Sequence, residues 1–151
     1  MEDGVEAARR LGITEADAGY DIDGWDSAAK TALLANVLMD ARVSPHDVDR
    51  GGIGRLTPER VLALAKARKT VCLVSRARTT PAGIRLRVRA EVMDDSNLLA
   101  TTEGTSNLLL LDTDLMGTIG IMGISSGVDQ TAYGLFSDAV DIAETVRLPG
   151  V

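Results

Sequence analysis

The sequence predicts an α+β domain in which a mixed or antiparallel sheet is covered on one face by helices. Two observations predict this class. Apolar residues recur at helical spacing in the first part of the chain, and in the middle part they alternate with polar residues at strand spacing. Helices and strands are therefore segregated along the chain and do not alternate as in doubly wound folds. Because the chain has 151 residues and is 45% hydrophobic, we expect a single domain over residues 1–151.

The helical pattern appears in four places. A short helix over residues 2–11 ends before Gly12, and a loop without periodicity follows over residues 12–24. The strongest pattern spans residues 25–42, and the apolar stripe expected to pack on the sheet is Ala29, Leu33, Leu34, Val37, Leu38 and Ala41. A third helix begins after Thr57 and reaches about residue 67, and a closing helix covers residues 129–148.

The strand pattern predicts two hairpins. In the first, residues 71–78 and 84–92 alternate apolar and polar side chains on either side of a turn at residues 80–83, which gives the hairpin one core face. In the second, residues 105–112 and 118–124 flank a turn around residues 114–117. A brief strand is also expected at residues 47–49.

Composition excludes several classes of partner. The net charge of −6 repels phosphate backbones, so we expect no nucleic-acid partner. No apolar window reaches the ~18 residues of a membrane span and the first residues are acidic, so a cytoplasmic protein without a membrane partner is expected. His46 and Cys72 are each the single residue of their type, so no metal site is expected, and Cys72 is interpreted as a small buried hydrophobe.

The loop before the long helix holds the candidate site. Acidic residues crowd into it, and Asp26 and Lys30 follow at i, i+4 spacing on one face of the helix, directed toward Glu15 and Asp21. An amino-acid substrate has an ammonium group that needs carboxylates, and its hydroxyl or aldehyde needs a proton donor or acceptor within about 3 Å. The plainer alternative is an ordinary surface ion pair beside solvated acids.

This segment resembles the signature of the homoserine dehydrogenases. The resemblance rests on fixed spacings that end four residues into the long helix, with Ala18 where the family has proline, and its residues are Gly12, Thr14, Glu15, Asp17, Asp21, Ile22, Gly24, Asp26 and Lys30. It implies that Lys30 exchanges a proton with the substrate oxygen and that Asp26 holds Lys30 or the substrate in place. It also implies that Glu15 and Asp21, with Thr14, bind the substrate, which is homoserine or aspartate 4-semialdehyde of threonine and methionine biosynthesis.

The resemblance continues to about residue 143. It includes the glycine-containing segment at residues 123–132, which in the family faces an NAD or NADP cofactor and here assigns Gly123, Gly127 and Thr131 to that role. Ile124 and Ser125 stand where the family usually has proline and glycine, and a plain strand-to-helix turn is the alternative interpretation. Family members also dimerise through this domain, so a homodimer is expected.

A nicotinamide enzyme usually carries Gly-x-Gly-x-x-Gly after its first strand, and nothing in the sequence fits that pattern. The resemblance therefore implies a nucleotide-binding domain supplied in cis or in trans, and we expect this chain alone to be inactive and to bind no cofactor tightly. A catalytically inactive homoserine-binding or oligomerisation module is the alternative. A third interpretation, the arginine-rich hairpin face as a nucleic-acid surface, is opposed by the net acidity and the few aromatic residues. A solvated or interface-facing sheet is the better account of these arginines.

Overall fold

The computed structural model of the chain describes residues 18–124 and 127–146. The helix expected over residues 2–11, with Thr14 and Glu15, lies outside these residues. The chain divides into two compact units, Met1–Thr101 and Thr102–Val151, and each is described by itself. The single domain over residues 1–151 stays a prediction.

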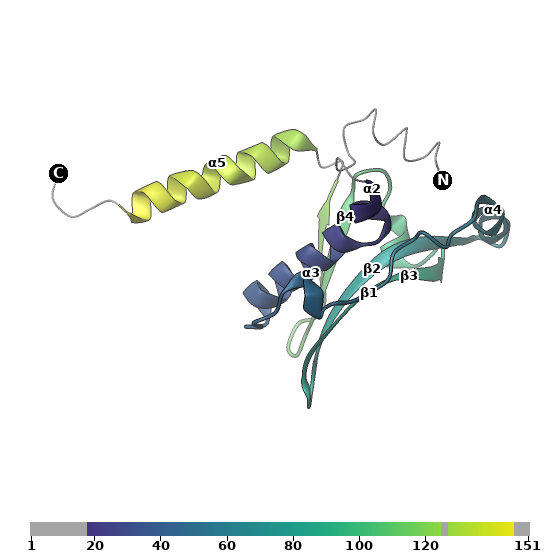
Figure 1. Cartoon of the computed structure of the whole chain (residues 1–151), viewed down its shortest axis with the longest axis horizontal. Coiled ribbons are helices and arrows are strands. Elements are labelled where there is room, and N and C mark those ends of the chain that lie inside the picture. The colour runs from purple at the N-terminus through teal and green to yellow at the C-terminus, as the bar shows by residue number, and fades with distance from the viewer. Residues whose placement is uncertain (1–17, 125–126, 147–151) are drawn as a thin grey trace. The chain divides into compact units, whose positions relative to one another are not determined.

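The sheet of the first unit is built on a long hairpin. Strand β2 (Lys69–Thr80) pairs antiparallel with β3 (Gly83–Asp94), and the short β1 (Asp49–Arg50) pairs parallel with β3, which gives the order β1-β3-β2 (Figure 1). This mixed sheet confirms the expected fold class and hairpin. Because opposed residues share a face, Leu73 with Ala90 and Ala77 with Leu86 lie on the same side of the sheet.

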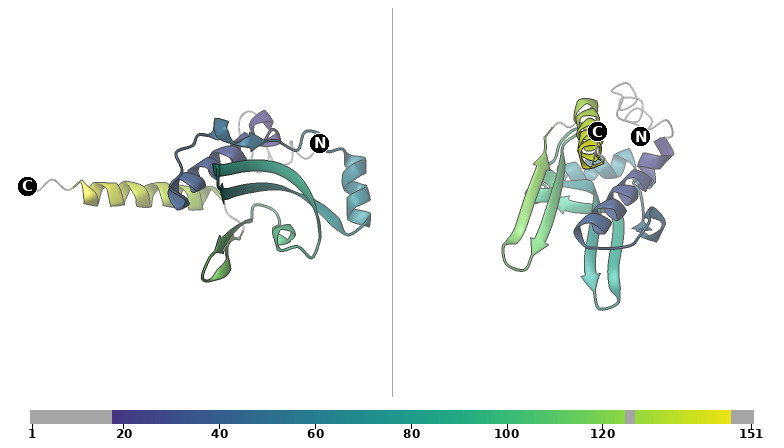
Figure 2. Two further views of the ribbon diagram at one scale, coloured as in Figure 1. Left: turned by 90° about the horizontal axis from the view of Figure 1, so that it is seen from below. Right: turned by 90° about the vertical axis from the view of Figure 1, so that its left-hand side faces the viewer.

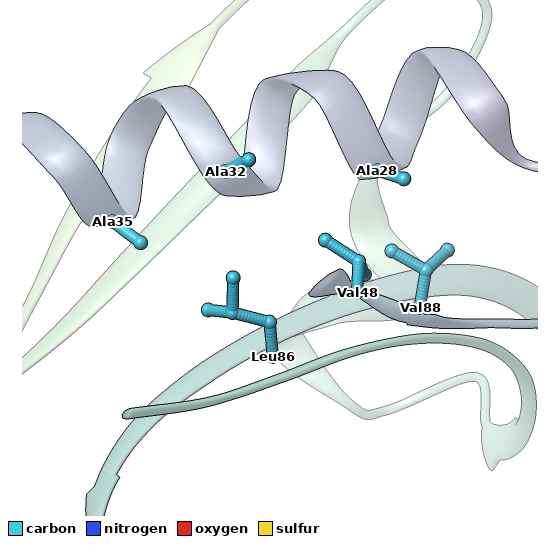
Figure 3. Packing of buried hydrophobic residues seen from close by; sticks show 6 residues of the cluster. All are labelled: Ala28, Ala32, Ala35, Val48, Leu86 and Val88. Atoms are coloured by element: carbon cyan, nitrogen blue, oxygen red, sulfur yellow. The ribbon is translucent and has the colours of Figure 1, made fainter. Parts of the chain in front are cut away.

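Helix α3 (Trp25–Leu38) covers that side of the sheet, as Figure 2 shows in its left view. Its buried residues are small and come from a single stripe, and Figure 3 shows the alanines of this stripe above Val48, Leu86 and Val88. The core cluster consists of Ala28, Ala32, Ala35, Val48, Leu86 and Val88. Small side chains let a helix approach a sheet closely, so branched residues of the strands fill the space between them. Thr31 is also buried, and its hydroxyl donates to the Ser27 carbonyl at 2.6 Å.

The prediction of which α3 face packs on the sheet is therefore wrong. The expected stripe faces away from the core, since Leu33, Val37 and Leu38 are 62%, 71% and 52% exposed. The helix is also shorter than expected, because the chain turns at Asp40, whose φ is 51°. The Asn36 side chain closes this turn, accepting from the Val43 amide at 3.0 Å and donating to the Val43 carbonyl at 2.9 Å.

Shorter elements surround this core. The loop expected over residues 12–24 contains a helix, α2 (Ala18–Ile22), which corrects that expectation. Of the strand expected at residues 47–49, Asp47 ends the 3₁₀ turn η1 (Pro45–Asp47), Val48 follows it in an extended conformation, and pairing begins only at Asp49. Helix α4 (Pro58–Lys66) begins after the Thr57 cap as predicted and lies at the end of the hairpin away from its turn, and η2 (Leu98–Thr101) follows β3 (Figure 1).

The second unit follows the predicted order. Strands β4 (Asn107–Thr113) and β5 (Gly117–Gly123) form an antiparallel hairpin, and helix α5 (Val128–Thr145) comes after them. Gly117 has a φ of 68°, and the Thr113 hydroxyl, which donates to the Gly117 carbonyl at 2.9 Å, closes the turn between the strands. None of the helices described here is long and apolar enough to cross a membrane.

Candidate functional site

The candidate site lies at a tight turn between α2 and α3. The Asp23 amide donates to the Gly19 carbonyl at 2.8 Å, and the Gly24 amide donates to the Asp21 carbonyl at 3.1 Å. Gly24 has a φ of 77°, a left-handed conformation that costs glycine little, and its own carbonyl accepts the first bond of α3 from Ala28. Two short segments of helix thus meet at Gly24, and α2 packs against α3.

Asp26 and Lys30 form an ion pair on α3. Lys30 Nζ lies 2.8 Å from Asp26 Oδ2, and the two side chains are 70% and 39% exposed. Lys30 is two residues from Ala28 and two from Ala32, which is about 200° around the helix from either, so the pair lies opposite the packed stripe. Asp26 also stands in the first turn, where the helix dipole favours a carboxylate. The pair is therefore accessible to a ligand, and its position is fixed by the packing of α3 on the sheet.

A backbone segment after β1 supports the turn from the other side. The Ile53 amide donates to the Ile22 carbonyl at 2.8 Å, and the Gly51 amide donates to the Val88 carbonyl at 2.8 Å. Between them, Gly52 packs so closely on the turn that a Cβ added to it would stand 1.9 Å from the Ile22 oxygen. Only glycine fits at this position without a shift of the backbone.

Trp25 joins the same segment to the start of α3. The Arg50 guanidinium stacks 3.9 Å above the Trp25 ring, and its Nη1 donates to the Asp23 carbonyl. His46 meets the ring edge-on with centroids 5.2 Å apart, and Tyr20 lies at 6.1 Å on a tilted plane. Sequence reasoning did not assign these residues to the site. The adjacent glycines 51 and 52 after a short strand were the available signal of a close backbone approach.

The predicted cofactor residues surround the start of α5 in the second unit. Gly123 ends β5, and Gly127 directly precedes the helix. The Gly127 amide donates to Gln130 Oε1 at 2.8 Å, and the Thr131 hydroxyl donates to the Gly127 carbonyl at 3.5 Å. These bonds cap the helix locally, so this amide is directed at a side chain of the same turn. Residues 125 and 126 lie outside the described residues.

Of the predicted substrate and catalytic residues, the structure brings together Asp26 and Lys30 and places Asp21 on the adjoining α2. Thr14 and Glu15 lie outside the described residues. Within residues 18–124 and 127–146, no three side chains of the metal-binding types gather as a metal site would require. Cys72 is half-buried beside the Leu99 carbonyl, and burial raises the pKa of its thiol, which suits a structural role.

Comparison with known protein families shows to which family the chain belongs. The sequence model of the family described as homoserine dehydrogenase matches residues 1–140. The chain belongs to the homoserine dehydrogenase family. The predicted signature over residues 12–30 and the family match therefore agree.

Individual homoserine dehydrogenases support this membership. The chain is 32% identical over 147 residues to a homoserine dehydrogenase of Methanocaldococcus jannaschii, covering 97% of the chain and 42% of that protein. It is 28% identical over 142 residues to an NAD(+)-dependent homoserine dehydrogenase of Pseudomonas canavaninivorans, covering 93% and 40%. The crystal structure of a homoserine dehydrogenase from Thiobacillus denitrificans aligns with a TM-score of 0.81 at 29% identity. The alignment covers 98% of the chain described here and 36% of the Thiobacillus denitrificans chain. The chain thus spans about two-fifths of the length of these curated relatives.

Proposed function

We propose that this chain carries the substrate-binding half of a homoserine dehydrogenase active site, with Lys30 as the acid–base residue. The enzyme would interconvert homoserine and aspartate 4-semialdehyde, a step of threonine and methionine biosynthesis. The observation that supports this proposal most is the Asp26–Lys30 ion pair. It lies at the start of α3, next to the α2–α3 turn, on the side of the helix that is exposed.

The chemistry of the reaction suits these residues. Aspartate 4-semialdehyde, NAD(P)H and a proton give homoserine and NAD(P)⁺, and the nicotinamide, when bound, supplies the hydride. The remaining proton must reach the aldehyde oxygen, and an ammonium held at a fixed place can donate it. Asp26 holds the Lys30 ammonium in place and restrains its flexible stem. Asp21, together with Thr14 and Glu15, would bind the substrate, and the carboxylates of Asp21 and Glu15 would pair with the substrate ammonium.

The cofactor needs residues beyond those that the structure describes. The turn between β5 and α5 resembles a cofactor-facing segment in having Gly123 and Gly127 on its two sides, but the Gly127 amide is already bonded to Gln130. A nucleotide diphosphate needs several free amides at a helix start. We therefore propose that a nucleotide-binding domain, in cis or in trans, binds most of the NAD or NADP, and that Gly123, Gly127 and Thr131 contribute one wall. The two units would act together as one substrate-binding and dimerisation domain.

The proposal is tested by joining the chain to the nucleotide-binding domain of a full-length relative and measuring steady-state kinetics. Lys30→Ala should lower kcat by about 10²-fold or more with a smaller change in KM for homoserine, because a positioned acid–base group contributes to the transition state. Lys66→Ala, which removes a lysine from the last turn of α4, is the matched control and should leave both constants unchanged. An unchanged kcat for Lys30→Ala would overturn the assignment.

A catalytically inactive homoserine-binding or oligomerisation module is the second candidate, since the amide of Gly127, a predicted cofactor residue, is bonded to Gln130 within the chain. The joined enzyme separates the two. Homoserine binding without turnover, in a fusion whose nucleotide domain binds NAD(P), would favour the inactive module. Turnover that depends on Lys30 would favour the enzyme.

A further inference from the structure

The face of the β2–β3 hairpin away from α3 is strongly basic. Val88 and Leu86 point into the core under α3, so the residues that alternate with them point to the other side. On that outer side Arg76 faces Arg87 and Arg78 faces Arg85 across the ladder, and Arg89 faces Val74. We call this surface the arginine face, and its basic residues are Arg76, Arg78, Arg85, Arg87 and Arg89.

Part of this positive charge is neutralised within the sheet. Glu91 accepts from Arg76 through two bonds, at 3.1 and 2.6 Å, and from Arg87 at 3.1 Å. The hydrogen bonds and charge of Arg76, reinforced by Arg87, lower the pKa of Glu91, and Glu91 in turn raises that of Arg76. Arg89 pairs with Asp49. These contacts hold three guanidinium groups in fixed positions.

The positive charges of the cross-strand pair Arg78 and Arg85 are not neutralised in this way. The two residues are directly opposed in the ladder, and no ion pair to a carboxylate is formed by either within the described residues. Like charges directly opposite each other destabilise a sheet. Because Arg78 and Arg85 lie next to arginines that are already oriented, this face is suited to bind an anionic ligand.

The same residues line a hollow. Its volume is about 550 Å³, and it is bounded by Asp49, Arg76, Arg78, Arg85, Arg87 and Glu91. This volume lies within the range of about 300–1,000 Å³ that small-molecule sites occupy. The lining contains no aromatic side chain, which distinguishes it from surfaces on which nucleic-acid bases stack.

We propose that the arginine face binds a small anion with two or more phosphoryl groups, at a site separate from Asp26 and Lys30. Arginine forks bind phosphate oxygens in a bidentate manner, and Arg78 and Arg85 together offer two forks across one ladder position. A second copy of the chain fits less well, because a twofold axis through this face would oppose it to an identical positive surface. Nucleic acid is disfavoured by the net charge of −6.

The test is calorimetric titration of the 151-residue chain with inorganic pyrophosphate at constant ionic strength. Pyrophosphate should bind more tightly than orthophosphate, and the double variant Arg78→Gln/Arg85→Gln should lose affinity by roughly tenfold or more. Arg60→Gln, which removes one exposed arginine from α4, is the control and should bind as the parent does. The double variant should fold at least as stably as the parent, because it removes an opposed pair of like charges.

Adenosine diphosphate is titrated in parallel to identify the source of the diphosphate. A higher affinity than for pyrophosphate assigns the ligand to the nucleoside diphosphates, and an equal affinity assigns it to free diphosphate; either supports the proposal. Equal pyrophosphate affinity in the parent and the double variant would overturn it. A change of oligomeric state in the double variant, with no change in pyrophosphate affinity, would show that the face is an interface between copies instead.

Discussion

Lys30 Nζ lies 2.8 Å from Asp26 Oδ2 on the side of α3 that faces away from the sheet. The opposite stripe of the helix packs on the sheet, since Ala28, Ala32 and Ala35 are at most 2% exposed. Packing and the candidate chemistry therefore use opposite sides of one helix. Substitutions on the two sides should have separable effects.

The first prediction concerns Asp26. Asp26→Asn keeps the shape of the side chain and removes the charge that restrains Lys30, so kcat of the joined two-domain enzyme should fall by about tenfold or more. Stability should change by no more than about 0.5 kcal/mol, because an exposed i, i+4 ion pair contributes little. The measurements are steady-state kinetics and thermal unfolding. Asp40→Asn, in the turn that follows the same helix, is the control, since asparagine tolerates the positive φ of that position. A loss of stability that accounts for the whole loss of activity would contradict a positioning role.

The second prediction tests the support of the α2–α3 turn. Gly52→Ala should destabilise the chain by about 1–3 kcal/mol and weaken homoserine binding, because the added Cβ would meet the Ile22 oxygen at 1.9 Å and push the turn away. Chemical unfolding and homoserine titration check this. Gly54→Ala is matched to it, since a Cβ there would stand at an ordinary 3.4 Å from Ile22. If the two variants behaved alike, the close approach at Gly52 would not be what holds the turn.

The third prediction tests which face of α3 is packed. Ala32→Leu adds volume to a position that is 2% exposed against the sheet, and overpacking of this kind costs about 1–3 kcal/mol. Leu33→Ala changes a side chain that is 62% exposed and should cost less than about 0.5 kcal/mol. Urea unfolding of both variants provides the comparison. A larger loss for Leu33→Ala than for Ala32→Leu would restore the packing predicted from the sequence.

The fourth prediction concerns the pH dependence of stability. Arg76 and Arg87 lower the pKa of Glu91 below its ordinary 4.5 in the folded chain, so the unfolded chain takes up this proton first as pH falls. The stabilisation is therefore fully present above about pH 4.5 and is lost as pH falls through the lowered folded value. Unfolding measured from about pH 6 to pH 3 should show a shallower decline for Glu91→Gln than for the parent. Glu103→Gln, which lies outside the arginine face, should follow the parent curve, and a parallel curve for Glu91→Gln would contradict this account.

Much of the fold could be predicted because strand periodicity depends on local alternation. The alternation of apolar and polar residues over residues 71–92 identified the hairpin and its core face, and the register that pairs Ala77 with Leu86 confirms it. The phase of α3 was wrong for a physical reason. The sequence pattern weights large apolar side chains, whereas the sheet selected the alanine stripe, because close approach of helix and strands depends on small side chains.

The candidate site could also be predicted only in part. The spacing of Asp26 and Lys30 on a helix determines that they meet, and the structure brings them into contact. The adjacent glycines 51 and 52 signal a close backbone approach, but not which segment they approach. Gly52 and Arg50 meet Ile22 and Asp23, nearly thirty residues earlier in the chain, only in the folded structure. Contacts of this kind depend on the path of the backbone, which the residue types alone do not reveal.

The most direct test of the central proposal is an amide proton–nitrogen NMR titration of the 151-residue chain with homoserine. The proposal predicts that the largest shifts occur at the amides of Asp21, Gly24, Asp26 and Lys30, and that Asp26→Asn reduces them at equal homoserine concentration while Asp40→Asn does not. An unchanged spectrum in this segment, or shifts confined to other elements of the chain, would contradict the assignment of the substrate site to the α2–α3 turn.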